Sequence, residues 1–154
     1  DPDPMGKNFF IDIHALDENI FWAVGMASLA FVTTDGGASW LARPTTLGMN
    51  HNNGICAVNE TDVWIAADYN NILFSDDQGA NWENQVIPED STAGGGYCMG
   101  ITTLDGNIAW IVNADYTGGT AFHTIDGGAT WVLQALPADG DVQLRRISFV
   151  DDLR

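Results

Sequence analysis

Short runs of alternating apolar and polar residues recur along the chain and are separated by turns rich in Asp, Asn and Gly. Each run has about the length of an ordinary strand, and no segment of useful length has the 3.6-residue period of a helix. Tight Asp-Gly turns between such runs are a strong signal for β-hairpins. The pattern therefore predicts an all-β protein built from antiparallel hairpins.

Three signals repeat in the same order along the chain. A turn of the form hydroxyl-x-Asp-x-Gly-x-x-Trp reads TTDGGASW at 33–40, SDDQGANW at 75–82 and TIDGGATW at 124–131. Upstream of each turn a short apolar run contains a second tryptophan, namely Trp22, Trp64 and Trp110. Further upstream lies an I-x-x-(L/V)-(D/N) run, at 13–17, 55–59 and 101–105, with a fourth copy at 147–151. A period of about 40–50 residues is typical of repeat architectures.

Each repeat predicts four antiparallel strands, which is the blade of a β-propeller. We predict an N-terminal extension over 1–9, blades over 10–47, 48–93 and 94–141, and the first strand of a fourth blade over 142–154. Because propellers close with about 4–8 blades, these repeats predict a piece of a longer protein or a ring completed by another chain. We expect Ile147 and Phe149 to lie against another blade.

The repeated turn has a structural explanation as a clasp. Glycine supplies the positive φ, while the Asp carboxylate and the Ser or Thr hydroxyl accept backbone N–H groups across the turn. We expect the tryptophan to open the fourth strand, to cover these bonds and to pack between blades. The residues assigned to this structural role are Thr33, Asp35, Gly37, Trp40, Ser75, Asp77, Gly79, Trp82, Thr124, Asp126, Gly128 and Trp131.

The turn resembles the Asp-box, or BNR repeat, of sialidase-type, sortilin-type, xyloglucanase-type and photosystem II assembly-factor-like propellers. The tryptophan-led strand followed by T-x-D-G-G-x-x-W most resembles the assembly-factor-like group. The resemblance covers about residues 10–154 and implies the fold, but propellers of this type do unrelated things. It also implies that ligands meet the face opposite the Asp-boxes. Assembly factors of this group use basic patches, which this acidic chain lacks, so only their fold is carried over.

On that opposite face, two loops between the second and third strands are similar. They read AADYNN at 66–71 and NADYTGG at 113–119. The hypothesis is a polar and aromatic rim for a sugar or a peptide; the alternative is repeat similarity among good turn residues. The candidate binding residues are Asp68, Tyr69, Asp115, Tyr116, His51 and Tyr97. His14 and His123 fall inside predicted strands and are interpreted as packed side chains.

Catalytic signatures are weak. The arginines do not stand in a sialidase-type motif, and no Tyr–Glu pair is evident. A glycosidase needs two carboxylates about 5–10 Å apart, for which Asp68 and Asp115 are candidates. No catalytic residue, metal site or cofactor is predicted; calcium at an acidic loop stays an alternative, although no loop has regular ligand spacing.

Composition restricts the partners. The net charge is −16, from 21 acidic against 5 basic residues, which disfavours nucleic acid and anionic membranes. No apolar run reaches the roughly 20 residues of a membrane helix, so no membrane insertion is predicted. Cys56 and Cys98 are interpreted either as two buried thiols or as a disulfide between neighbouring repeats, which would suit an exported protein. The first residues, DPDPMGKN, suggest a processed mature end or an arbitrary boundary.

These observations favour a non-enzymatic binding or scaffold module of an exported bacterial propeller protein, secreted or at the cell surface. Its expected partners are the remaining blades, from the same protein or another chain, and a protein or glycan ligand on the face opposite the Asp-boxes. The alternative is part of a glycoside hydrolase propeller, sialidase- or xyloglucanase-like, with catalytic residues outside this segment.

Overall fold

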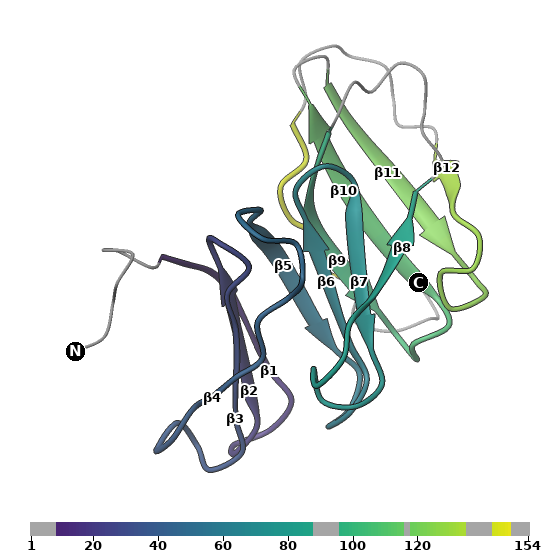
Figure 1. Ribbon diagram of the computed structural model, residues 1–154. Coiled ribbons are helices and arrows are strands. Elements are labelled where there is room, and N and C mark those ends of the chain that lie inside the picture. The colour runs from purple at the N-terminus through teal and green to yellow at the C-terminus, as the bar shows by residue number, and fades with distance from the viewer. Residues whose placement is uncertain (1–8, 88–95, 116–117, 135–142, 149–154) are drawn as a thin grey trace.

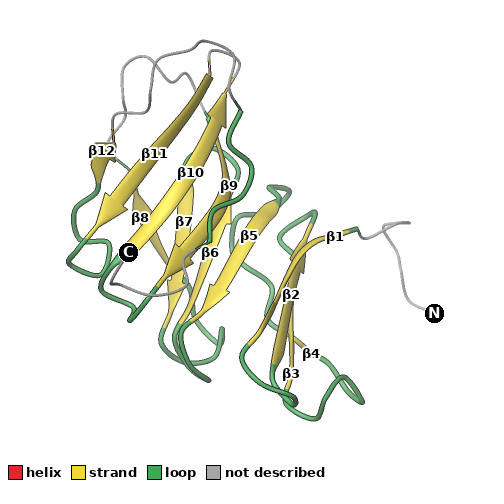
Figure 2. Ribbon diagram, turned by 180° about the vertical axis from the view of Figure 1, so that it is seen from behind, coloured by secondary structure: helices red, strands yellow, loops and turns green. Residues whose placement is uncertain are grey.

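Three four-stranded antiparallel sheets stand side by side in the computed structural model, which describes residues 9–87, 96–115, 118–134 and 143–148 (Figures 1 and 2). The arrangement confirms the predicted all-β fold with four antiparallel strands in each unit. Among the described residues there is no helix with the length and apolar character needed to cross a membrane.

Every sheet has the same order, with consecutive strands paired from the inner to the outer edge. The strands of the first blade are β1 (Phe10–Ala15), β2 (Phe21–Gly25), β3 (Ala30–Thr33) and β4 (Leu41–Ala42). Those of the second are β5 (Asn52–Ala57), β6 (Val63–Ala67), β7 (Asn71–Ser75) and β8 (Glu83–Val86). Those of the third are β9 (Tyr97–Thr103), β10 (Ala109–Asp115), β11 (Gly118–Thr124) and β12 (Val132–Gln134).

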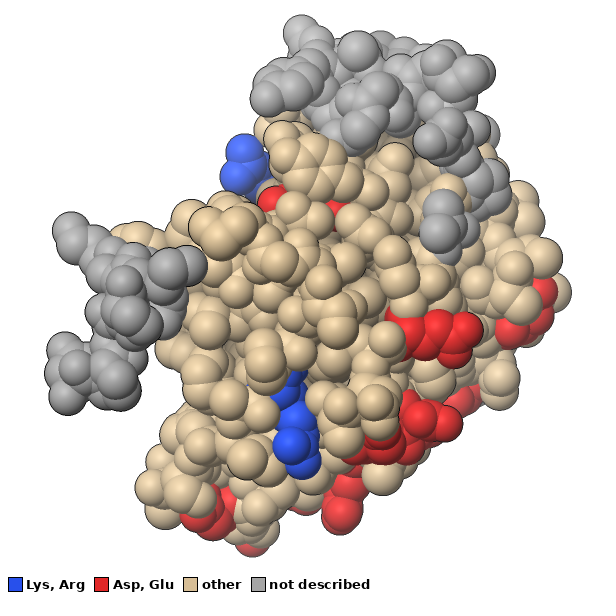
Figure 3. Space-filling model, in the orientation of Figure 1, with Lys and Arg blue, Asp and Glu red and all other residues tan. Residues whose placement is uncertain are grey.

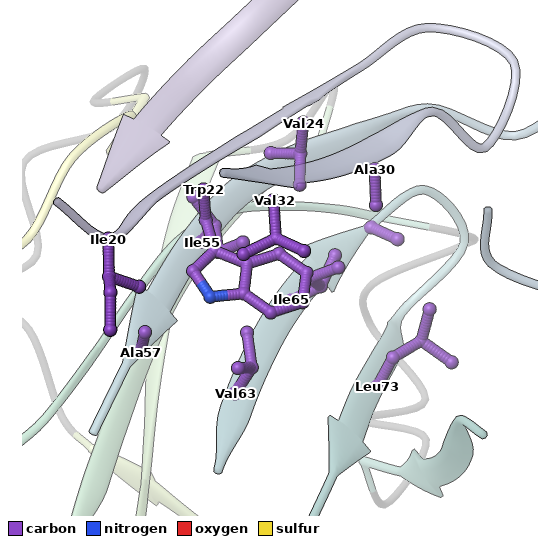
Figure 4. Close-up of a cluster of buried hydrophobic side chains, with 11 residues drawn as sticks. Ile20, Trp22, Val24, Ala30, Val32, Ile55, Ala57, Val63, Ile65 and Leu73 are labelled. Carbon is purple, nitrogen blue, oxygen red and sulfur yellow. The ribbon is translucent and has the colours of Figure 1, made fainter. Parts of the chain in front are cut away.

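Two apolar cores fill the joints between blades. Trp22 is fully buried between the first and second blades, where it lies among residues such as Val32, Ile55 and Ile65 (Figure 4). Trp64 is fully buried in the second core, together with Ile111 of the third blade. Each core draws side chains from two blades, so the hydrophobic effect holds neighbouring blades together.

All three Asp-box turns are closed by the same hydrogen bonds. In the first turn the Thr33 hydroxyl donates to Asp35 and accepts the N–H of Gly37, at 2.8 and 2.9 Å. The other carboxylate bonds come from the backbone and hydroxyl of Ser39, at 2.8 and 2.6 Å. The second and third turns repeat this pattern around Asp77 and Asp126. The turns are therefore held by short-range polar contacts rather than by burial.

The Asp-box tryptophans differ from the expectation in two ways. Each precedes the fourth strand instead of opening it, because β4, β8 and β12 begin one residue later. Trp82 meets Trp22, and Trp131 meets Trp64, each edge to face at a centroid distance of 6.2 Å. Trp40, by contrast, is 45% exposed, because no described blade precedes the first one. The ring packs between blades only where a preceding blade supplies the partner.

Of the two interpretations of the cysteines, the structure has the one without a disulfide: Cys56 and Cys98 are free, buried thiols. The Asn53 side chain donates to the Cys98 carbonyl at 3.0 Å, so Cys98 lies beside Asn53. The Cys56 thiol instead lies at the backbone of Thr103. Three residues of strand separate Asn53 from Cys56, which is about 10 Å, whereas a disulfide needs Cα atoms within about 7 Å. Burial raises the pKa of both thiols.

Residues 143–148 lie against the third blade but form no strand within the described segment. An added Cβ on Gly100 of β9 would stand 3.2 Å from the Arg145 carbonyl oxygen, so the two backbones touch. Arg146 pairs with Asp12 of β1, which also accepts the N–H of Ile55 at 3.0 Å. Ile147 is half-buried, and Phe149 lies outside the described residues. The segment thus bridges the third and first blades.

The Asp-box carboxylates are expected to make the fold acid-sensitive. The Ser39 hydroxyl, followed by the Ser39 N–H and the Thr33 hydroxyl, lowers the pKa of Asp35 to about 2. The N–H and side-chain amide of Asn81 lower the pKa of Asp77. The Thr130 hydroxyl likewise lowers the pKa of Asp126. A carboxyl with a lowered folded-state pKa stabilises the fold above its unfolded pKa of about 3.9. That contribution is lost as the pH falls from about 4 towards 2.

Asp77→Asn is expected to lower the thermal midpoint at pH 7, because an amide cannot reproduce the carboxylate's acceptor set. The deficit relative to the unmodified chain should shrink as the pH falls below the ordinary carboxyl pKa of about 3.9, because the carboxylate of the unmodified chain is itself protonated when the pH falls through its lowered folded-state pKa. Circular dichroism melts across this range are the measurement. A deficit that stays constant with pH would show that the charge of Asp77 contributes nothing to the clasp.

Candidate functional site

A hollow of about 560 Å³ opens at the joint between the second and third blades. Its lining residues come mainly from the β6–β7 turn, the loop before β5 and the start of β9. These segments lie at the end of the sheets opposite the Asp-box turns (Figure 1). The residues that line it are Met49, Asn50, His51, Asn53, Asp68, Tyr69, Tyr97, Met99, Ala114, Gln143 and Arg145. The structure therefore brings together four of the six residues predicted to bind a ligand.

Asp68 forms the polar floor of the hollow and is only 8% exposed. One carboxylate oxygen accepts the N–H of His51 at 2.9 Å, and the other accepts the Asn53 side-chain amide at 2.9 Å. The Nδ1 atom of His51 lies 3.7 Å from the same carboxylate. Because both oxygens already hold hydrogen bonds, Asp68 orients its neighbours and is poorly placed to act as a catalytic acid or nucleophile.

Tyr69 and Tyr97 form an aromatic pair across the joint. Their ring centroids are 5.9 Å apart and their planes are inclined by 43°, and Tyr69 is 61% exposed. The turn that carries Tyr69 is tied to the third blade, because the Asn70 N–H donates to the Gly96 carbonyl at 3.0 Å. The Asn113 amide donates to the Asn70 side chain at 2.6 Å. The relative position of the two rings is thus set by the blade contact.

The other predicted residues lie elsewhere. Asp115 ends β10, where the structure describes its backbone and not its side chain, and Tyr116 lies outside the described residues. His14 lies in β1, where burial lowers its pKa. His123 lies in β11 and stacks on Trp110 at 4.1 Å. Both histidines lie outside the hollow.

Sequence reasoning missed several residues that line the hollow. Asn53 and Met99 lie where the pairing register of the inner strand shifts, at the start of β5 and of β9. Such bulges re-aim side chains and leave no reliable trace in a single sequence. Gln143 and Arg145 belong to the segment that follows the third blade, and Arg145 donates to the Gln143 side chain at 3.2 Å. The weak fourth copy of the strand signal was the only hint that this segment reaches the centre.

Charge is distributed unevenly on the face of the molecule shown in Figure 3. In Figure 3 the acidic side chains gather over the lower part of the view, the end that carries the Asp-box turns. Arg145 supplies a cation at the hollow on the opposite end. Among the described residues, no group of three or more His, Cys, Asp or Glu side chains could hold a metal ion. The described part of the hollow is therefore a mixed apolar and polar surface without a metal centre.

A second hollow, of about 630 Å³, lies on the open side of the first blade. Its lining includes Phe10, Ile13, Phe31 and Trp40, and the first two of these are more than half exposed. Blade joints elsewhere in the chain bury this side of the sheet. This hollow is therefore interpreted as a blade-packing face rather than as a ligand site.

Comparisons with solved structures show the same fold in longer proteins. A structure described as YCF48 bound to D1 peptide is 24% identical over 82% of this chain and 39% of that chain, with a TM-score of 0.68. YCF48 from Cyanidioschyzon merolae is 23% identical over 82% of this chain and 37% of its own, with a TM-score of 0.62. An ancestral GH74 enzyme is 12% identical over 84% of this chain and 19% of its own, with a TM-score of 0.61.

The chain thus spans about two fifths of the two YCF48 structures. At these identities the likeness to solved structures shows a shared fold. No match was found among curated proteins. The family described as photosynthesis system II assembly factor YCF48 matches residues 4–148, which is nearly the whole sequence. The chain belongs to the YCF48 family of BNR-type propellers.

Proposed function

We propose that the chain is part of a non-enzymatic propeller that binds a peptide segment of a partner protein at the hollow between the second and third blades. The observation that carries this proposal is the pair of the exposed Tyr69 and the half-buried Tyr97, set across a blade joint beside a hollow of about 560 Å³. Family membership supports it, because a similar YCF48 structure contains a D1 peptide.

The lining suits a peptide. Tyr, Met and Arg are enriched in the cores of protein interfaces, and all three are present here. Met49 is 69% exposed, and with Met99 it offers flexible, polarisable side chains that adapt to an apolar residue. Gln143 and Arg145 can donate hydrogen bonds to peptide carbonyl groups. A glycan would use the tyrosine faces but would gain little from the methionines.

A hydrolytic role has less support. Glycoside hydrolysis uses two carboxylates that face the scissile bond. Among the described residues that line the hollow, Asp68 is the one carboxylate, and both of its oxygens accept hydrogen bonds from the protein. The likeness to the GH74 enzyme rests on 12% identity and concerns the fold.

Location and assembly also belong to the proposal. A secreted or cell-surface location is supported by the net charge of −16, which favours solubility in a salty medium. The remaining blades, from the same protein or from another chain, are proposed to cover the apolar face of the first blade. The 45% exposure of Trp40 supports this, since its counterparts Trp82 and Trp131 lie against the preceding blade.

Phage-displayed random dodecamers selected on the immobilised chain test the peptide site. We expect peptides to be enriched, and we expect Tyr97→Ala to weaken binding of the most enriched dodecamer by about tenfold or more, as hot-spot truncations do. Leu133→Ala is the matched control, because Leu133 is 47% exposed on β12, away from the hollow. Binding of the chain to glycans on an array, without enrichment of any peptide, would contradict the proposal. Equal losses of peptide binding in Tyr97→Ala and Leu133→Ala would also contradict it.

A further inference from the structure

The β6–β7 turn holds a tyrosine in an unfavourable backbone conformation. Tyr69 and Asn70 both have φ of 59°, and the Asn71 N–H donates to the Asp68 carbonyl at 3.4 Å. Positive φ at both central residues defines the type I′ hairpin turn, which favours Asn, Asp or Gly. A bulky side chain in this region is strained by contact between its Cβ and the following carbonyl. Asn70 fits this preference, and Tyr69 does not.

The first blade shows what the fold requires at this position. Ala27 and Ser28 occupy the same turn between β2 and β3, with φ of 54° and 60°, and the Leu29 N–H donates to Met26 at 3.3 Å. Ser28 donates to the Asn50 carbonyl of the next blade at 2.7 Å, as Asn70 does to Gly96. The turn shape and the link to the next blade are therefore achieved with alanine in place of tyrosine.

Burial does not compensate the strain at Tyr69. The side chain is 61% exposed, and the one ring it meets at close range is that of Tyr97. Residues held in sparsely populated backbone regions cluster at ligand-binding sites, where the surrounding structure imposes the conformation. Here that structure is the pair of hydrogen bonds through which Asn70 contacts Gly96 and Asn113.

We propose that Tyr69 is the specificity-determining residue of the peptide site, held in strain by the blade joint so that its ring and that of Tyr97 receive an apolar side chain of an extended peptide. This inference rests on the proposed function and adds the residue and the ligand chemistry. The apolar preference follows from the lining: Met49 and Met99 line the same hollow as the two rings, and the buried carboxylate of Asp68 is already paired. An uncharged apolar group has the lowest free-energy cost of desolvation on entering this site.

Three variants separate the strain from the binding. Tyr69→Asn should raise the thermal midpoint by about 2–4 °C, because asparagine suits the type I′ position. The same variant should weaken binding of the most enriched dodecamer by about tenfold or more. Tyr69→Phe keeps the ring and should leave the thermal midpoint and the dissociation constant of the dodecamer near those of the unmodified chain. Ala27→Asn is the matched control: it relieves the equivalent turn of the first blade and should raise the midpoint without changing the dissociation constant.

A double-mutant cycle identifies the side chain that the rings receive. Each residue of the dodecamer is replaced by alanine in turn, and the dissociation constant of each peptide is measured with the unmodified chain and with Tyr69→Asn. We expect a strong coupling energy with Tyr69 at one apolar position of the peptide. Equal dodecamer binding by the unmodified chain and Tyr69→Asn would overturn this inference and leave the peptide site intact. A lowered midpoint in Tyr69→Asn, or coupling at a charged position, would also overturn it. If no dodecamer binds the unmodified chain, the proposed function and this inference are overturned together.

Discussion

Replacing Trp64 with alanine is expected to lower the free energy of unfolding by about 3–5 kcal/mol, the usual cost of truncating a buried aromatic residue. Trp64 is fully buried and contacts Phe74 at 4.8 Å and Trp131 at 6.2 Å between ring centroids. Its truncation would leave a large cavity in the core that joins the second and third blades. Because a domain is stable by only about 5–15 kcal/mol, the variant should be largely unfolded in mild denaturant. Urea unfolding followed by far-ultraviolet circular dichroism measures the change.

Trp40→Ala is the matched control for this experiment. Trp40 is a tryptophan of the same repeat but is 45% exposed, and no described blade lies against its box. Its replacement should cost less than about 1 kcal/mol, as surface substitutions do. Equal losses in the two variants would contradict the assignment of Trp64 to a blade-joining core and would show that Trp40 is covered in solution.

The strands could be predicted where a strong pattern recurs. The tryptophan-led runs became β2, β6 and β10, and the Asp-Gly turns lie between the third and fourth strands of each sheet. Both signals are local, since alternation and turn chemistry act within a few residues. The fourth strands were predicted too early, since each begins one residue after its Asp-box tryptophan. The first blade shows the same offset without a described preceding blade, so the offset does not depend on a neighbouring blade.

The sequence left two interpretations of the cysteines open, because the choice between buried thiols and a disulfide depends on the register between blades. Neighbouring inner strands were expected to place Cys56 beside Cys98, but β5 and β9 are offset so that Asn53 takes that place. Bulges at the start of each inner strand contribute to this offset. A one-residue shift moves a side chain to the other face of a sheet, so contacts between strands of different blades cannot be read from repeat spacing.

The candidate site was partly visible in the sequence. The repeated Asp-Tyr slot pointed to Asp68 and Tyr69, and the joining loops pointed to His51 and Tyr97, all of which line one hollow. What the sequence could not show is the division of roles among them. Asp68 is a buried hydrogen-bond acceptor, whereas Tyr69 is exposed and strained. Such roles depend on burial and backbone dihedral angles, which follow from the packing of two blades.

Adding a side chain at a crowded Asp-box glycine is expected to have a second large effect on stability. Gly79 has φ of +74°, and an added Cβ would stand 2.9 Å from the rings of Trp22 and Trp82 and 3.1 Å from the Arg43 Cβ. Gly37 occupies the same place in the first box, with φ of +91°, but the nearest atom to its added Cβ is 4.0 Å away on Trp40. The two glycines share a backbone conformation and differ in whether a preceding blade crowds them.

Gly79→Ala is expected to lower the free energy of unfolding by about 2–5 kcal/mol. Left-handed backbone strain costs about 1–2 kcal/mol, and overpacking against two tryptophan rings costs about 1–3 kcal/mol more. Gly37→Ala should carry the strain cost and little else, so the difference between the variants isolates the crowding at the blade joint. Urea denaturation of the two proteins in parallel measures that difference. Equal losses would mean that the rings of Trp22 and Trp82 move apart to admit a methyl group, and that the first and second blades are joined less tightly than their buried tryptophans indicate.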